Sequence, residues 1–158
     1  MKLKLSDFCD MAEFERILSD WTVTSHMSAI VRDDEQQYIT KNYGFSKYCE
    51  LIRSTEAGFE ACLHCKHNAE LFRCHGGLYN FAVPINLPSG QTIAYAICGQ
   101  EKLAEKDEPD FKALAAACQV DEEHLRYEYS QIKPKSREEI EAAKALLSSV
   151  INSFVGRS

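Results

Sequence analysis

In one segment the spacing of apolar residues changes from a helical repeat to every second residue, and this change constrains the fold more than any other feature. From Tyr79 to Leu87, in YNFAVPINL, every second residue is apolar. This alternation is typical of a β-strand that buries one face. A turn at residues 88–90 (PSG) follows, and QTIAYAICGQ returns with β-prone residues. The sequence therefore predicts an antiparallel β-hairpin.

The returning strand has one face of small side chains. Ala94, Ala96 and Cys98 share it, and the volume beside them must be filled by a covering helix or by a ligand. We predict that Phe81, Ala96 and Cys98 line a ligand pocket between this face and the cysteine-bearing helices. Pro84 has no N–H to donate, so its strand should have an edge, a bulge or an irregularity there.

Most of the remaining chain shows helical patterns. Apolar spacing predicts an amphipathic helix at about residues 6–25 and a short helix over SKYCELIRS. A longer helix is expected near 55–74, with Gly76 and Gly77 as its C-terminal cap. Between the first two helices, MSAIVRD and QQYITKN predict a second hairpin. These elements together indicate an α+β fold with a small antiparallel sheet covered by helices.

The C-terminal part of the sequence is helical as well. FKALAAACQ and DEEHLRYEY predict two short helices, and a long amphipathic helix follows at about residues 136–155. Ser136 and Glu139 have the spacing of a capping box. The apolar stripe of the long helix suits a dimer seam or an output connector, or a helix that folds back over its own sheet.

Length and composition exclude several classes of protein. A chain of 158 residues that is 45% hydrophobic has the size of one globular domain. Its formal charge of -6 carries no basic stripe, which argues against direct binding to nucleic acid. No apolar window is long enough to span a membrane, and the N-terminus has no secretory pattern, so we expect a cytoplasmic protein. Its seven cysteines are then expected to be reduced thiols.

The segment CLHCKHNAELFRCHGG, residues 62–77, concentrates cysteine and histidine. On the expected helix, Cys62 and Cys65 would be neighbours at i and i+3, whereas Cys74 and His75 would lie out of phase with them. One alternative is a zinc or iron site on Cys62, Cys65, Cys74 and His75, with help from Cys49. Such a site would require the helix to break near its end.

Two other interpretations of this segment stay open. Free cysteine is among the most buried residue types, so the thiols can be ordinary core residues. They can also form a redox sensor based on Cys62, Cys65 and Cys74. An enzyme is not expected, because adjacent Cys74 and His75 form no catalytic dyad and the motifs for phosphate, dinucleotide and zincin chemistry are absent from the sequence.

The order of three phrases, FSKYCELIRSTEAGFEACLHC, RCHGGLYNFAVPI and AICGQ, resembles the PocR sensory domain family over about residues 5–155. The resemblance implies a PAS-like ligand-binding module of bacterial and archaeal signalling proteins. It implies recognition of a small, weakly polar organic molecule such as a diol or another hydrocarbon derivative. By the same resemblance, Cys49, Cys62, Cys74 and His75 match motif positions that line or brace the sensory core.

The resemblance also implies partners and a division of the chain. Domains of this kind occur beside histidine kinases, cyclases and DNA-binding modules, so we expect a linked output domain or a homodimer. We assign residues 1–135 to the sensory domain and 136–158 to a connector or dimerisation helix of the same domain. The predicted ligand-binding residues are Cys49, Cys62, Cys74, His75, Phe81, Ala96 and Cys98.

Overall fold

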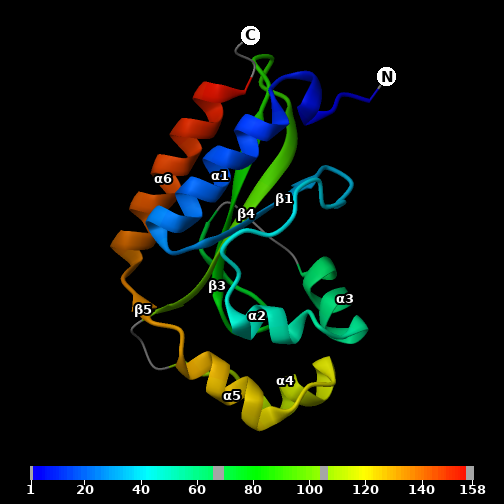
Figure 1. Cartoon of the computed structure of the whole chain (residues 1–158), viewed down its shortest axis with the longest axis vertical. Helices are drawn as coiled ribbons and strands as arrows, with labels where there is room; N and C mark the ends of the chain where they lie inside the picture. The colour runs from blue at the N-terminus through cyan, green and yellow to red at the C-terminus, as the bar shows by residue number, and fades with distance from the viewer. Residues whose placement is uncertain (1, 66–69, 104–106, 156–158) are drawn as a thin grey trace.

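The computed structural model describes residues 2–65, 70–103 and 107–155, which form an α+β fold around an open sheet (Figure 1). Four strands pair antiparallel in the order β1-β4-β3-β2, and β5 pairs in parallel with the end of β4. The strands are β1 (Ser28–Asp33), β2 (Phe72–Arg73), β3 (Tyr79–Asn86), β4 (Thr92–Leu103) and β5 (Pro134–Lys135). The predicted α+β class and the hairpin of β3 and β4 are confirmed.

Helices begin where a side chain can accept hydrogen bonds from the first turn. Asp10, Ser46, Thr55, Asp110, Asp121 and Ser136 each accept such a bond from a backbone N–H. The helices are α1 (Met11–Ser25), α2 (Lys47–Ile52), α3 (Glu56–His64), α4 (Phe111–Cys118), α5 (Glu122–Ser130) and α6 (Arg137–Phe154), with a 3₁₀ turn η1 at Leu5–Asp7. The capping box of Ser136 and Glu139 is confirmed. The first helix begins at Met11 instead of residue 6 because Asp10 caps it.

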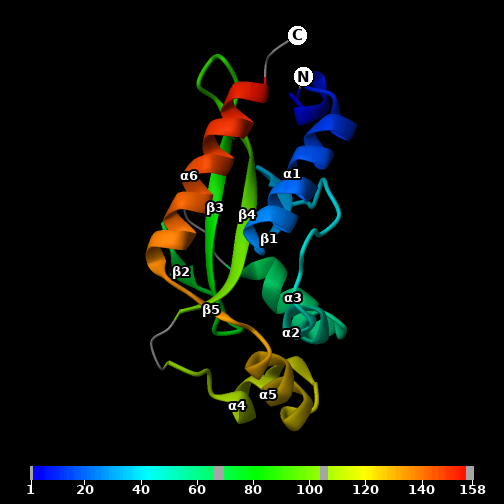
Figure 2. The same cartoon turned by 60° about the vertical axis from the view of Figure 1, so that its left-hand side comes forward.

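The main core lies between the sheet and the helices α1 and α6, which pack against the same face (Figures 1 and 2). Trp21 joins the three layers: its Nε1 donates to the carbonyl oxygen of Ala143 at 3.1 Å, and its ring meets the Phe81 ring edge-on at 6.5 Å. Leu147 and Ile151 of α6 are fully buried in this core. The long C-terminal helix therefore folds back over its own sheet.

The small-residue face of β4 belongs to this same core. Ala94, Ala96 and Cys98 are completely buried beneath α1 and α6, together with Phe81 from β3. Phe81, Ala96 and Cys98 were predicted to face the cysteine-bearing helices, but they face α1 and α6 instead. The volume beside these small side chains is therefore filled by covering helices and not by a ligand.

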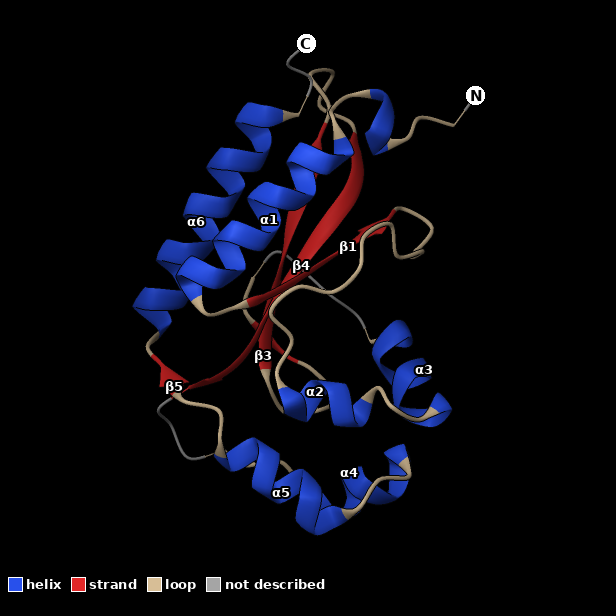
Figure 3. Ribbon diagram, in the orientation of Figure 1, coloured by secondary structure: helices blue, strands red, loops and turns tan. Residues whose placement is uncertain are grey.

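A second core lies at the end of the molecule where α2, α4 and α5 gather (Figure 3). The ring of Tyr129 lies at its centre and packs edge-on against two other rings, with its centroid 5.5 Å from that of Tyr48 and 5.1 Å from that of Phe111. Tyr48 is fully buried, and its hydroxyl donates to the carbonyl oxygen of Gly76 at 2.6 Å. This bond ties α2 to the turn that follows β2.

The predicted helix over 55–74 is wrong beyond residue 64. Cys65 is the extended C-cap of α3, and Phe72 and Arg73 pair with the start of β3. Residues 66–69, which include His67, lie outside the described part of the chain. Pairing with β3 satisfies backbone groups that a helix end would have left open, and this tertiary effect outweighs local helix propensity.

The CHGG sequence forms the turn between β2 and β3 and does not cap a helix. Gly77 N–H donates to the carbonyl oxygen of Cys74 at 2.9 Å, and Cys74 N–H donates to that of Leu78 at 2.8 Å. Gly77 has φ +83, and a Cβ there would lie 2.8 Å from Pro109. Glycine is required at this position by both backbone conformation and space.

The second predicted hairpin forms only in part. β1 is present, but QQYITKN forms no strand: it contacts β1 through one isolated bridge, Arg32 with Tyr38, and Tyr43 directly after it forms a second bridge with Ala29. β1 pairs along its length with the distant β4. Pro84 lies beyond the β3 residues that pair with β2, which are Tyr79 and Asn80, and a register shift follows directly after it, between Ile85 and Asn86, so the predicted irregularity is present beside it.

Candidate functional site

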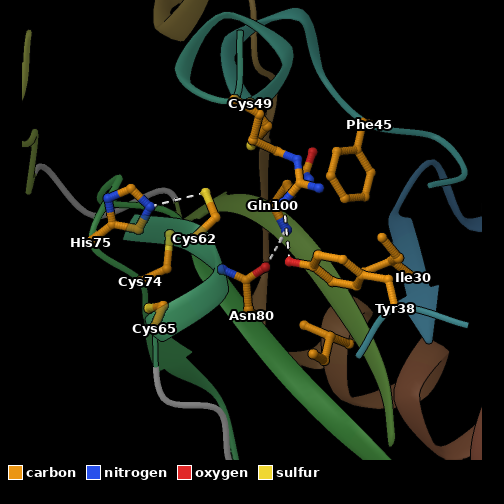
Figure 4. Close-up of a pocket in the computed structure, with 12 residues that line it drawn as sticks. Ile30, Tyr38, Phe45, Cys49, Cys62, Cys65, Cys74, His75, Asn80 and Gln100 are labelled. Atoms are coloured by element: carbon orange, nitrogen blue, oxygen red, sulfur yellow. Dashed lines mark hydrogen bonds between the residues drawn. The ribbon is translucent and has the colours of Figure 1, made fainter. Parts of the chain in front are cut away.

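A pocket lies on the sheet face opposite α1 and α6 (Figure 4). Its floor is Ile30 of β1 and Ile97 of β4, which pack with Ala82 in a small separate cluster. The cavity has a volume of about 70 Å³. The lining residues are Ile30, Tyr38, Phe45, Cys49, Arg53, Cys62, Cys65, Cys74, His75, Asn80, Ile97 and Gln100.

Three separate elements bring the thiols to this pocket. Cys49 comes from α2, Cys62 from α3, and Cys74 from the turn after β2 (Figure 4). The close approach of α3 to α2 depends on Gly58, where a Cβ would lie 1.7 Å from the carbonyl oxygen of Ile52. Any larger residue would push α3, and Cys62 with it, away from the pocket.

Cys62 and His75 form a hydrogen-bonded pair across the pocket wall, with Sγ and Nε2 3.0 Å apart. Burial raises the pKa of Cys62 to about 11, although the charge of Arg53 acts in the opposite direction. Burial also lowers the pKa of His75. Both groups are therefore neutral near pH 7, and the tautomer of the imidazole decides which of Sγ and Nε2 donates.

The neighbouring thiols are held neutral in the same way. Burial raises the pKa of Cys49 and of Cys74, and each also lies near another cysteine. A neutral thiol is a weak nucleophile and a weak ligand, because the thiolate is the reactive form. All seven cysteines are free, so the structure contains no disulfide. This environment suits apolar contact and weak hydrogen bonding.

The predicted metal residues Cys62, Cys65, Cys74 and His75 all line this pocket, together with Cys49. Within residues 2–65, 70–103 and 107–155, however, no group of three or more His, Cys, Asp or Glu side chains converges to hold a metal ion. A zinc or iron site needs such convergence, usually of four ligands for structural zinc.

Polar groups at the inner end of the pocket are fixed by the sheet. Asn80 Oδ1 accepts from Gln100 N–H at 3.1 Å, and Asn80 Nδ2 donates to the carbonyl oxygen of Leu78 at 3.2 Å. Gln100 Oε1 accepts from Ser46 N–H, the cap of α2, at 2.9 Å. Gln100 has φ +61 at an irregular position of β4. The pocket is thereby linked to both α2 and the end of β4.

The outer wall is aromatic and carries a cation. The Arg53 guanidinium lies 5.3 Å from the ring centre of Tyr38, 5.2 Å from that of Phe45 and 4.7 Å from that of Phe59. Its Nη1 donates to the Tyr38 hydroxyl at 3.3 Å. Cation–π contacts of this kind hold the charge at the pocket without a carboxylate.

Of the predicted ligand-binding residues, Cys49, Cys62, Cys74 and His75 meet in one pocket, whereas Phe81, Ala96 and Cys98 face the opposite core. The aromatic, arginine and amide side chains of the wall were not among the predicted residues. A signal was present for five of them, Phe45, Arg53, Asn80, Ile97 and Gln100, which fall within the phrases FSKYCELIRST, GGLYNFAVPI and AICGQ, whereas Ile30 and Tyr38 lie outside these phrases. The residues missed are Ile30, Tyr38, Phe45, Arg53, Asn80, Ile97 and Gln100.

Comparison with known families gives a match to the sensory domain found in PocR, over residues 7–158. The chain belongs to the PocR sensory domain family. Searches of curated proteins and of solved structures give no match. Membership in this family implies a sensory ligand-binding role and points to a non-catalytic one, in agreement with the neutral thiols of the pocket. In the described part of the chain, no helix is long and apolar enough to cross a membrane.

Proposed function

We propose that this PocR domain is a sensor that binds one small, weakly polar organic molecule, a diol or another hydrocarbon derivative, in the cysteine pocket. The observation that supports this most directly is the pocket itself. Cys49, Cys62, Cys74 and His75, which the family resemblance singled out, come from separate elements to line one cavity. Apolar walls with a few fixed polar groups are the usual composition of a small-molecule site.

The size of the cavity supports a small ligand. At about 70 Å³ it is roughly half the volume of a cavity that holds benzene, about 150 Å³. By this ratio about three non-hydrogen atoms fit inside it without rearrangement of the walls, and a slightly longer molecule would extend into the open side of the pocket. Thiols are compatible with an aliphatic body because neutral cysteine behaves as a small apolar residue.

The route of the signal in this proposal runs along β4 to α6. Gln100 lines the pocket, and the next residue, Glu101, is buried and paired with Lys135 at 3.2 Å. Lys135 lies in β5, directly before α6. A ligand that prefers one position of Gln100 would favour one arrangement of this junction. Helix α6 would pass that change to a homodimer partner or to an output domain such as a kinase, a cyclase or a DNA-binding module.

The proposal is tested by filling the cavity. The Ile97→Phe variant places a ring where the ligand would lie, and Tyr95→Phe is the control because Tyr95 is on the same strand and 40% exposed. Small alcohols, diols and acids are screened by thermal shift against the wild type and both variants. We expect compounds that raise the Tm of the wild type and of Tyr95→Phe but not that of Ile97→Phe. Equal shifts in all three proteins would contradict binding in this cavity.

A metal or thiol redox sensor is the alternative function, and it stays a prediction. Its working groups would be Cys62, Cys65, Cys74 and His75. Elemental analysis of protein purified without chelator tests it. About one equivalent of zinc or iron per chain that survives dialysis, with loss of stability on chelation, would support the alternative.

A further inference from the structure

The pocket has more free hydrogen-bond donors than free acceptors. Two of its side-chain acceptors already accept a bond, Asn80 Oδ1 from Gln100 N–H and Gln100 Oε1 from Ser46 N–H, and His75 Nε2 is already hydrogen-bonded to Cys62 Sγ. The guanidinium of Arg53 and the amide groups of Asn80 and Gln100 carry more N–H groups than these bonds use. A ligand that brings acceptors would complement this wall better than one that brings donors.

Arg53 is a cation without a carboxylate partner in the described part of the chain. The rings of Tyr38, Phe45 and Phe59 lie against the guanidinium. The N–H groups of a guanidinium point outward in its plane, and an aromatic face does not accept hydrogen bonds from them in that direction. One of these, from Nη1, reaches the Tyr38 hydroxyl, and the guanidinium also lies within reach of the Cys62 thiol, which leaves further N–H groups of the five unused. The plane of the guanidinium therefore still has donors suited to a carboxylate.

A second arginine adds to the positive charge behind Tyr38. Arg32 is only 3% exposed, and its guanidinium carbon also lies 5.3 Å from the Tyr38 ring centre. Its Nη2 donates to the carbonyl oxygen of Leu63 at 2.7 Å and to Gln36 Oε1 at 3.1 Å. Its Nε is buried without a hydrogen-bond partner among the residues described. No carboxylate of residues 2–65, 70–103 or 107–155 forms an ion pair with it.

Two guanidinium groups therefore share one aromatic ring, and no described acid neutralises either of them. Burial of an uncompensated charge is unfavourable, and a bound anion would relieve that cost. The acids that follow Arg32 in sequence are engaged elsewhere: Asp33 Oδ1 accepts from the N–H groups of Glu35 and Gln37, and Asp34 pairs with Lys2 at 3.4 Å. The pocket wall thus has an unmatched positive charge beside an apolar floor.

We infer that the ligand of this pocket is a short-chain carboxylate, with its carboxylate against Arg53 and its aliphatic chain over Ile30 and Ile97. This inference rests on the proposed function, binding of one small organic molecule in this cavity, and changes the ligand class from weakly polar molecules to carboxylate anions with a short aliphatic chain. Arg32 contributes long-range attraction from behind Tyr38, while Arg53 supplies the hydrogen-bonding fork. The neutral thiols contact the chain and leave the charge to the arginines.

The test compares four probes of equal size that differ in charge and hydrogen bonding: propanoate, propane-1,2-diol, butan-1-ol and butylammonium. Their affinities are measured by isothermal titration calorimetry for the wild-type chain and for Arg53→Gln. The control is Arg16→Gln, because Arg16 is an exposed arginine on α1 that pairs with Glu13 and Asp20. Thermal unfolding of each variant reports whether it is folded.

We expect propanoate to bind the wild type at least about tenfold more tightly than the diol or the alcohol, and butylammonium to bind most weakly. Arg53→Gln should remove that preference, while Arg16→Gln should keep it. If Arg53→Gln does not fold, the order of the probes on the wild type decides. The affinity for propanoate should also fall in Arg53→Lys if the carboxylate binds through two N–H groups, because lysine keeps the positive charge but lacks the paired donors of the guanidinium.

The outcomes separate the two levels of the proposal. If the diol or the alcohol binds the wild type as well as propanoate does, or if Arg53→Gln leaves the preference unchanged, the carboxylate inference is overturned and the sensor proposal stands. If none of the four binds the wild type in a way that Ile97→Phe abolishes, the carboxylate inference is overturned and small-molecule binding in this cavity loses its support as well.

Discussion

Cys62 and His75 show how burial determines the chemistry of a residue pair. The two atoms are at hydrogen-bonding distance, 3.0 Å, which in an exposed or cationic setting would favour a reactive thiolate. Here burial raises the pKa of Cys62 to about 11 and lowers that of His75. The pair is therefore a neutral donor and acceptor that holds α3 against the turn after β2.

This account predicts slow alkylation of Cys62. At pH 8 a thiol with a pKa of about 11 is ionised on the order of one part in a thousand, whereas an ordinary cysteine is ionised to roughly a quarter. Iodoacetamide labelling followed by peptide mass spectrometry should show Cys62 reacting far more slowly in the native protein than in urea. Equal rates in the two states would contradict a neutral, buried thiol and would favour the redox alternative.

Gly77 permits a second prediction at this scale, because the chain holds a matched control. Gly77 and Gly90 both have positive φ, +83 and +93, but a Cβ at Gly77 would meet Pro109 whereas a Cβ at Gly90 would meet nothing within 4 Å. Gly90→Ala should cost about 1 kcal/mol of unfolding free energy from backbone strain alone. Gly77→Ala should cost more, measured by urea denaturation. Equal losses would show that Pro109 yields without cost.

At the level of single residues, the sequence predicted the cysteine and histidine side of the pocket better than its aromatic side. The motif residues Cys49, Cys62, Cys74 and His75 do line one cavity. Tyr38, in contrast, lies in an irregular segment, and only the folding of that segment over β1 brings it beside Arg32 and Arg53. No periodicity in the sequence reports such a contact.

Among the elements, strong periodic patterns were predictable and interrupted ones were not. The alternation over β3 and the capping box of α6 both hold in the structure. The helix expected over 55–74 failed because its second half contributes β2, a strand of two residues whose partner is supplied by β3. Strand pairing of this kind depends on a distant segment, and a local window cannot contain it.

The small-residue face of β4 was predicted correctly as a face but placed on the wrong side of the molecule. Alternation shows which residues point the same way, and it does not show which neighbour covers them. In the structure α1 and α6 cover Ala94 and Ala96, while Ile97 points to the pocket.

Helix α6 offers an element-scale test through two adjacent leucines. Leu147 is fully buried in the main core, whereas Leu146 is 57% exposed. Leu147→Ala should lower the unfolding free energy by about 2–5 kcal/mol, and Leu146→Ala should change it by less than about 0.5 kcal/mol. Urea denaturation measures both. A large loss from Leu146→Ala that depends on protein concentration would instead place Leu146 in a dimer interface.

The whole molecule is organised around the two faces of one sheet. One face is sealed by α1 and α6, and the other carries the pocket beneath Tyr38, Phe45 and the cysteine-bearing segments. Strand β4 runs past the pocket to the junction with β5 and α6. The packing of α1 and α6 on the first face leaves the second face open for the cysteine pocket.

That junction should make global stability depend on pH. Glu101 is 3% exposed, and burial raises its pKa to about 7 although Lys135 lies 3.2 Å away and opposes the shift. The native state therefore holds a proton that the unfolded chain, with a pKa near 4.3, releases. The resulting stability is fully present below about pH 4.3 and is lost as pH rises through about 7.

Urea denaturation at a series of pH values measures this effect. Between about pH 4.5 and 7 we expect Glu101 to lower the unfolding free energy by up to about 3 kcal/mol as pH rises. In Glu101→Gln, which cannot titrate, that part of the slope should disappear. Identical slopes for the variant and the wild type would show that Glu101 is not the group responsible.

The central claim is that a small molecule binds in the cysteine pocket, and an NMR titration tests it most directly. Backbone amide shifts are followed while propanoate, and separately propane-1,2-diol, is added to the wild-type chain and to Ile97→Phe. The account predicts saturable shifts centred on Cys49, Cys74 and Gln100 in the wild type, with no such shifts in the variant. Shifts that centre on another surface, or that are the same in both proteins, would contradict it.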